Sequence, residues 1–199
     1  MKKIRFAIIF GLICAIVLSQ VNFNMLCDDL RENVLRLHII ANSDDKADQD
    51  LKLKIRDAIL KEAGNIFANA KNLEGAEETV KKHLKKFEEI AKRIIKENGF
   101  NYTATASLGE RFFETRHYEN FSLPAGNYRS LIIDLGESKG KNWWCVIYPT
   151  VCVPAASGDL RDAVNENSAQ IAEQSERYII RFKIVEIYEK LKLKLSNLE

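Results

Sequence analysis

The chain has 199 residues, of which 46% are hydrophobic and 29% charged, with 30 basic residues against 28 acidic ones. This length and composition are typical of one globular domain with a real hydrophobic core, and they exclude a mini-protein held together by disulfides. The formal net charge of +2 includes Lys2, Lys3 and Arg5 at the extreme N-terminus, so the remainder is near neutral and gives no reason to expect nucleic-acid binding.

The N-terminus has the pattern of an export segment. The three basic residues precede an uncharged apolar run over residues 6–18. This run is typical of a secretory signal and is shorter than the roughly 20 residues that cross a bilayer as a helix. Residues 1–23 are therefore predicted to be an export signal or a membrane anchor, and cleavage after Ser19 and retention both stay open. The excess of positive charge before the run places the bulk of the chain outside the cytoplasm in either case.

A strand and two helices are predicted for the next part of the chain. Residues 34–40 alternate between apolar and polar side chains, which indicates a strand with one covered face. Helix-capping residue types at 41–45 precede a helix whose apolar positions, within residues 51–66, lie on one face. A second helix over residues 73–94 has apolar side chains at spacings of three and four. Its lysines at 81–86 are interpreted as a solvated helix face and not as a basic patch.

Strands dominate the second half of the prediction. Residues 102–108 alternate and turn near Gly109 toward a partner strand at 111–118. Within residues 124–152, the apolar runs 128–135 and 143–148 flank a polar turn and predict a hairpin. Its second strand is apolar on both faces, which is typical of a strand in the centre of a sheet.

The C-terminal part is predicted as a mobile loop at about 155–176, a last strand at 178–184 and a helix over 185–195. The order of elements implies an α+β fold, with a mostly antiparallel sheet of about five to six strands, two helices packed on one face and a C-terminal helix. Residues 33–199 are predicted to form a single domain.

The sequence contains no clear catalytic or metal-binding pattern. His38, His83 and His117 lie in three separate predicted elements without the spacing of metal ligands, and no nucleotide-binding or hydrolase motif is present. Cys145 with His38 or His117 would supply a nucleophile and a base, but a cysteine in a central strand is normally inert. No catalytic residue, metal or cofactor is therefore predicted.

Cysteines and tryptophans gather in one short segment. Cys145 and Cys152 are a candidate disulfide, because thiols seven residues apart around a proline turn can join outside the cytoplasm. The alternative is two small buried thiols. Trp143 and Trp144 would point to opposite faces of a strand. One of them would fill the core, while an exposed one, together with Asn142, is a candidate contact for a partner protein.

Four sequence blocks resemble the stage II sporulation protein R family of endospore-forming bacteria. They are LRLHIIANSD at residues 35–44, DQDLKLKIRDAI at 48–59, LPAGNYRSLIIDLG at 123–136 and GKNWWCVIYPTVC at 140–152. The blocks follow the order and spacing of that family, behind a similar export segment.

The resemblance implies a signalling protein and not an enzyme. Proteins of this family are made in the forespore and exported into the space between the forespore and mother-cell membranes. There they activate a membrane-bound aspartyl-type protease of the mother cell, which processes the precursor of the sigma factor sigma-E. The chain is thus expected to be released or anchored in that space, to touch the membrane through its N-terminal segment alone, and to bind no nucleic acid. An exported Cys-dependent hydrolase and an envelope-anchored interaction domain are the alternatives.

Overall fold

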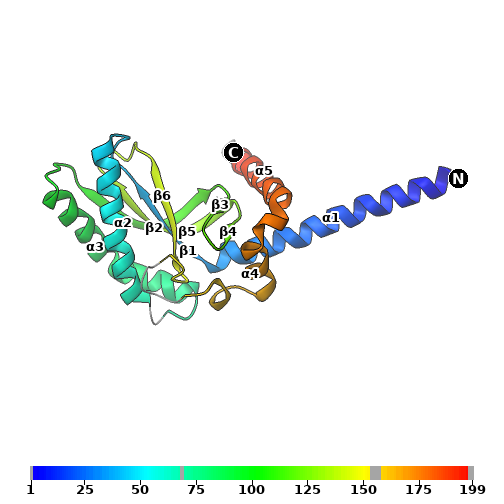
Figure 1. Ribbon diagram of the computed structural model, residues 1–199, viewed down its shortest axis with the longest axis horizontal. Coiled ribbons are helices and arrows are strands. Elements are labelled where there is room, and N and C mark those ends of the chain that lie inside the picture. Colours follow the sequence, from blue (N-terminus) through cyan, green and yellow to red (C-terminus); the bar gives the residue numbers. More distant parts are fainter. Residues whose placement is uncertain (1, 68–69, 153–157, 197–199) are drawn as a thin grey trace. The chain divides into compact units, whose positions relative to one another are not determined.

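The computed structural model describes residues 2–67, 70–152 and 158–196, whose helices and strands are drawn in Figure 1. The chain divides into two compact units. Unit 1 consists of Met1–Arg31, Phe113–Gly126 and Asn165–Glu199, and unit 2 consists of Glu32–Phe112 and Asn127–Val164. A single domain over residues 33–199 would require these units to be joined firmly, and it stays a prediction.

A mixed four-stranded sheet forms the centre of unit 2. Strand β1 (Leu35–Ile40) pairs in parallel with β5 (Gly126–Leu135) and antiparallel with β6 (Asn142–Tyr148), and β2 (Ala104–Phe113) lies beside β5. The order in the sheet is β2, β5, β1, β6. Among the described strands, β2 and β6 therefore form its edges.

The predicted hairpin within residues 124–152 is wrong, because β1 lies between its two strands. The turn from β5 to β6 passes the end of β1 and bonds to it. The Gly140 N–H donates to the Ala41 carbonyl (2.9 Å) and the Lys139 N–H donates to the Asn42 carbonyl (3.1 Å). Gly140 leaves no room for a side chain, since a Cβ there would lie 2.1 Å from the Ser43 carbonyl oxygen. The segment with both tryptophans is thus an edge strand, and β1 is central.

Helices α2 (Lys46–Ile66) and α3 (Leu73–Glu97) pack on one face of the sheet, as predicted. Their apolar sides and the β1 side chains Leu35, Leu37 and Ile39 form one buried core. Asn72 caps the start of α3, and its side chain accepts a hydrogen bond from the Gly75 N–H. Burying apolar side chains of this kind stabilises a fold by about 1.5–3 kcal/mol for each fully covered residue.

The lysine cluster at 81–86 lies on the solvated side of α3, as predicted. Lys81 and Lys82 pair with glutamates one turn earlier in α3, and Lys86 pairs with Glu62 of α2 at 2.5 Å. Exposed ion pairs of this type contribute little to stability. The lysines therefore do not form an uncompensated basic patch.

Unit 1 contains nearly all of α1 (Lys2–Asn33). This helix contains an 18-residue window with a mean hydropathy of 2.3. It is therefore long and apolar enough to cross a membrane, and a signal sequence can have the same length and hydropathy. Most side chains of the apolar run are exposed, whereas Phe23, Cys27 and Leu30 are buried. The first part of α1 is thus free to enter a bilayer, and the last part belongs to the folded unit.

The buried end of α1 packs against α5 (Ile179–Ser196). The Phe23 ring lies 5.3 Å from the Phe182 ring, measured between centroids. The Arg31 guanidinium pairs with Asp28 at 2.6 Å and with Glu189 of α5 at 3.6 Å. Arg31 and Glu189 are each 7% exposed, so removing Arg31 would take away the cation that pairs with the buried Glu189, whereas removing Glu189 would leave Arg31 paired with Asp28.

Three predictions for the later part of the chain are wrong. Residues 178–184 do not form a strand, because α5 starts at Ile179. Residues 111–118 are no hairpin partner, since β2 continues through Gly109 to Phe113, and the short strands β3 (Arg116–His117) and β4 (Ser122–Leu123) form a separate pair. The described strands therefore form two sheets in place of the single sheet that was predicted, and the larger one is mixed, since β1 is parallel to β5 and antiparallel to β6.

Much of the predicted loop at 155–176 has helical structure. Helix α4 (Glu166–Glu173) is capped by Asn165, whose side chain accepts from the Ser168 N–H, and 3-10 helices cover Leu160–Asp162 and Ser175–Tyr178. Residues 155–157 of this prediction lie outside the described residues. Short capped helices of this length lack a strong apolar period, which is why the sequence indicated a loop.

Candidate functional site

The residues that the sequence singled out lie along β6, at the edge of the unit 2 sheet. In the pairing of β6 with β1, Trp143 lies opposite Ile39, Trp144 opposite His38 and Cys145 opposite Leu37. Since side chains alternate along a strand, Trp143 and Cys145 face the helices and Trp144 faces the other side. The prediction that the two tryptophans point to opposite faces is confirmed.

Trp143 is held beneath helix α2. Its side chain is half-buried against the core, and the guanidinium of Arg56 lies over its ring at 4.3 Å from the centroid. A cation over an indole face contributes about 0.5–1 kcal/mol at an exposed site. Arg56 also pairs with Asp57 at 2.6 Å, which fixes the guanidinium in place. Trp143 is therefore part of the packing between helix and sheet.

Trp144 stacks on a histidine of the neighbouring strand. Its ring centroid lies 4.2 Å from that of His38, with the ring planes 10° from parallel. Burial lowers the pKa of His38, and a hydrogen bond with the Asn142 side chain partly offsets this effect. The imidazole is therefore neutral at neutral pH. Trp144 is half-buried and Asn142 is exposed, so Asn142 is the most accessible of the candidate contact residues.

A hydrogen-bond network fixes the segment that precedes β6. Asp48 of α2, which is 5% exposed, accepts from Ser43 Oγ (2.6 Å), Asn42 Nδ2 (2.8 Å) and Tyr102 Oη (2.6 Å). Burial alone would raise the pKa of Asp48, but these three hydrogen bonds, together with one from the Ser43 backbone, outweigh it and lower the pKa. Asn42 Oδ1 in turn accepts from the Glu137 N–H at 2.9 Å. One buried carboxylate thus joins the β1–α2 connection to the turn that leads to Asn142.

Sequence reasoning interpreted residues 41–45 as a helix cap and missed this network. Asp45 occupies the cap position of α2, but its side chain accepts no cap hydrogen bond. Instead, Asp44 Oδ1 accepts from the Lys141 N–H at 2.7 Å, and Lys52 Nζ donates to the Lys141 carbonyl at 2.8 Å. The polar cluster therefore positions a distant turn. The sequence did contain one sign of this cluster, which is the charged Lys52 on the otherwise apolar side of a helix.

Cys145 and Cys152 lie next to each other, and both are free thiols in the structure. Cys152 Sγ accepts from the Val146 N–H at 3.4 Å and from the Cys145 thiol. This second hydrogen bond and burial raise the pKa of Cys145 far above its ordinary value. The Cys145 thiol therefore stays protonated at neutral pH, which makes it a poor nucleophile.

The geometry separates Cys145 from His38. Cys145 belongs to the core on the helix side of the sheet, whereas His38 lies on the opposite side against Trp144. These two residues cannot form the nucleophile and base of a hydrolase. Within residues 2–67, 70–152 and 158–196, no group of three or more His, Cys, Asp or Glu side chains is placed to hold a metal ion.

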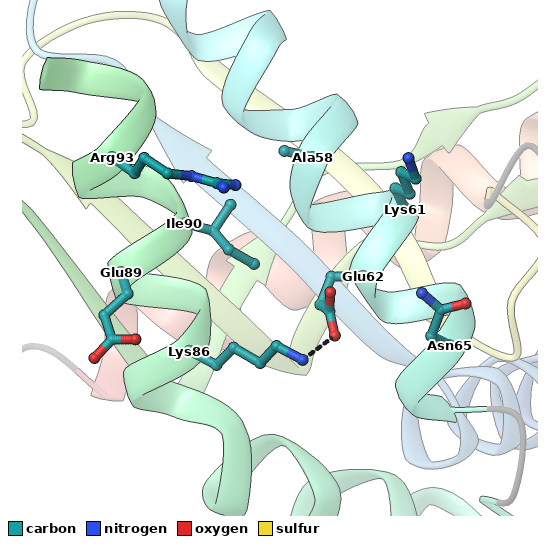
Figure 2. A pocket seen from close by; sticks show the side chains of 8 residues that line it. All are labelled: Ala58, Lys61, Glu62, Asn65, Lys86, Glu89, Ile90 and Arg93. Carbon is teal, nitrogen blue, oxygen red and sulfur yellow. Dashed lines mark ion pairs between the residues drawn. The ribbon is translucent and has the colours of Figure 1, made fainter. Parts of the chain in front are cut away.

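A shallow groove of about 600 Å³ runs between α2 and α3, as Figure 2 shows. Its walls are mostly charged, and they are formed by Ala58, Lys61, Glu62, Asn65, Lys86, Glu89, Ile90 and Arg93. Lys86 reaches across the groove to Glu62, while Glu89 points away from that pair. Cations and carboxylates balance each other here, so the groove offers no selective site for an anion or an apolar ligand.

Comparison with known proteins decides the family. The model of a family described as stage II sporulation protein R matches residues 31–158. The chain belongs to this family. The match includes strands β1 to β6, the Asp48 network and every candidate residue of β6, and it leaves out α4, α5 and most of α1.

A curated relative agrees with this assignment. The chain is 36% identical over 121 residues to a protein named stage II sporulation protein R from Bacillus subtilis (strain 168). The aligned part covers 61% of this chain and 54% of the relative, so the chain spans about half the length of the relative it matches. No solved structure matches the chain. Family membership implies a role in sporulation.

Proposed function

We propose that the chain is an exported signalling protein of endospore formation, which activates a membrane-bound aspartyl-type protease of the mother cell. The protease then processes the sigma-E precursor. The observation that supports this proposal most strongly is the family match over residues 31–158. The mechanism itself is what the resemblance of the four sequence blocks implies for this chain.

The N-terminal helix supports export. The exposed apolar part of α1 is consistent with a signal peptide or a membrane anchor, and its basic start keeps the N-terminus on the cytoplasmic side. The folded part of the chain would then lie in the space between the forespore and mother-cell membranes, either released or held by α1. Cleavage after Ser19 would leave the buried residues Phe23, Cys27 and Leu30 in place.

The chain would act by binding, and the catalytic residues would belong to the protease. The protonated Cys145 thiol and its separation from His38 argue against the alternative of a Cys-dependent hydrolase. An activator needs a firm contact surface, since a preorganised surface loses little entropy on binding. The exposed Asn142, with the half-buried Trp143 and Trp144 beside it, is the proposed contact, and the Asp48 network holds the turn that precedes it.

Co-expression tests the proposal. The full chain, the candidate protease and the sigma-E precursor are produced together in a host that does not sporulate, and the processed fraction is measured. We expect processing to rise clearly above the level with protease alone. A matched variant, Ile9→Arg, places a charge in the apolar run of α1 and should abolish both export and activation. Processing that stays at the level of protease alone, although export is verified, would refute the proposal.

A further inference from the structure

Helix α5 has two opposite apolar sides. One side is buried at Phe182 and Val185, and the Phe182 ring packs against Phe23 of α1. The other side is a stripe of exposed apolar residues. At 100° per residue, their spacings of four, three, one, three and four positions place them on one face about 100° wide. We name the α5 stripe by its residues, which are Ile180, Ile184, Ile187, Tyr188, Leu191 and Leu195.

Basic side chains flank the α5 stripe on both borders. At 100° per residue, Lys183, Lys190 and Lys194 fall along one border, and Arg181 and Lys192 fall along the other. The helix contains five basic and two acidic residues, which leaves a net charge of 5 − 2 = +3. Both acidic residues lie away from the stripe. They are Glu186, which pairs with Lys183 and Lys190, and the buried Glu189. Lys190 also pairs with Glu114, outside the helix, at 2.7 Å, so part of the charge along this border is balanced by carboxylates.

The start of α5 touches α1 where the apolar run of α1 ends. Arg181 donates to Ser19 Oγ at 2.8 Å, and its guanidinium lies 5.5 Å from the centroid of the Phe23 ring. Figure 1 shows α5 running at an angle to α1. A bilayer that receives residues 6–18 of α1 would therefore end close to the first turn of α5.

We propose that the α5 stripe lies on the surface of a bilayer that contains anionic lipids. An exposed apolar face bordered by lysine and arginine is the pattern of helices that lie in the membrane interface. The apolar side chains would enter between the headgroups, while the long basic side chains reach the lipid phosphates. Because α5 lies outside the residues matched by the family model, this inference goes beyond the proposed function, and it rests on that function only in the premise that residues 6–18 of α1 enter a bilayer.

Fluorescence in nanodiscs tests the α5 stripe with the full chain. An environment-sensitive fluorescent amino acid replaces Ile184, which is 45% exposed, and the discs contain equal parts of phosphatidylcholine and phosphatidylglycerol. A matched chain has the same reporter in place of the exposed Glu176. Lipids brominated in their acyl chains should quench the reporter at 184 roughly threefold more than the reporter at 176.

Two further arms test whether the reporter meets lipid through the apolar stripe and its basic borders. Ile187→Glu with Leu191→Glu changes exposed positions and should abolish the extra quenching while thermal unfolding in detergent stays the same. Discs of phosphatidylcholine alone should reduce the quenching clearly. Equal quenching at 184 and 176 would overturn the proposal, as would quenching that ignores lipid charge. The reporter could instead shift to the blue without being quenched by brominated lipids, and the shift could grow with protein concentration. That result would overturn the proposal and show that a second copy of the chain covers the stripe.

Discussion

Trp144 of β6 stacks on His38 of β1 on the side of the sheet that faces away from α2 and α3, with their ring centroids 4.2 Å apart. Its neighbour Trp143 lies on the helix side under Arg56. The two tryptophans thus have separate environments, and each is half-buried by other residues of unit 2. A partner protein would meet the exposed Asn142 and the uncovered parts of these rings, and not two free indole groups.

We expect His38 to make the protein less stable in mild acid. Burial lowers the pKa of His38, so below about pH 6.5 the unfolded chain binds a proton that the folded chain does not. This contribution to stability is present above the unfolded pKa and is lost as the pH falls through that value toward the folded pKa. The free energy of unfolding should decrease by at most about 1.4 kcal/mol per pH unit from this group.

Urea unfolding across this pH range measures the effect. His38→Phe keeps an aromatic ring on Trp144 and removes the proton, so it should flatten the pH dependence between pH 5 and 7, roughly the range in which histidine titrates. His83→Gln is the matched control, because it removes a half-buried histidine of α3 and should keep the dependence. An unchanged slope in His38→Phe would contradict the assignment.

Asp48 should be the most sensitive carboxylate of the β1–α2 connection. Asp48→Ala leaves Ser43, Asn42 and Tyr102 without their shared acceptor, and we expect a loss of about 3 kcal/mol in the free energy of unfolding. Asp50→Ala, at an exposed position of the same helix, should cost less than about 0.5 kcal/mol. Chemical denaturation of both variants gives the comparison. Equal losses in the two variants would mean that the hydrogen-bond network of Asp48 does not add to the free energy of unfolding.

The pH dependence of Asp48 has the same sign as that of His38 but a different cause, because burial lowers the pKa of His38 whereas hydrogen bonds lower the pKa of Asp48 against the effect of burial. Its folded pKa is lowered, so its contribution is present above the unfolded value of about 3.9 and is lost as the pH falls through the folded value. Acid unfolding of the parent chain should therefore steepen below about pH 4, and Asp48→Ala should lose this component.

The sequence predicted local elements better than their arrangement. The apolar periods of residues 34–40 and of the two helices that follow correspond to β1, α2 and α3, and both helices pack on one face of the sheet. Alternation along β5 and β6 could not reveal that β1 lies between them, because strand order depends on contacts between distant residues. The hydrogen bond between Tyr102 and Asp48 could not be predicted either, because these two residues are far apart in the sequence.

Helix α5 shows how a period can mislead. Tyr178, Ile180, Phe182 and Ile184 alternate as they would in a strand. In the structure, Phe182 faces α1 and Ile184 is exposed, so the alternation records two apolar sides of one helix. A helix with apolar residues on opposite sides fits both periods, and the sequence pattern alone cannot choose between them.

We expect oxidation to join Cys145 and Cys152 in the exported chain. The two thiols are already in hydrogen-bond contact, and an oxidising compartment favours the bridge. Mass spectrometry of the exported chain without reductant should show a loss of two protons in one peptide that contains both residues. Alkylation of both thiols without prior reduction would show the bridge to be absent, and Cys152→Ser provides the matched chain that cannot form it.

A bulky charge at the proposed contact should impair activation without unfolding the chain. Asn142 is exposed, so Asn142→Arg should shift the melting temperature by less than about 4 °C, while activation of the protease falls about tenfold. Asn101→Arg makes the same chemical change at another exposed position of unit 2 and should leave activation unchanged. Equal activation by both variants would move the contact away from Asn142.

Reconstitution in vesicles tests whether the chain activates the protease from the side that an exported signal reaches. The candidate protease is placed in lipid vesicles with the sigma-E precursor on one side, and the purified chain is added to the other side, where an exported signal would arrive. The measurement is the initial rate of precursor cleavage with the parent chain, with Asn142→Arg and without any added chain. We expect a rate that rises with the concentration of the parent chain until it saturates, and a much smaller rise with Asn142→Arg. A rate that stays at the level of protease alone, with folded protein and active protease verified, would contradict this expectation.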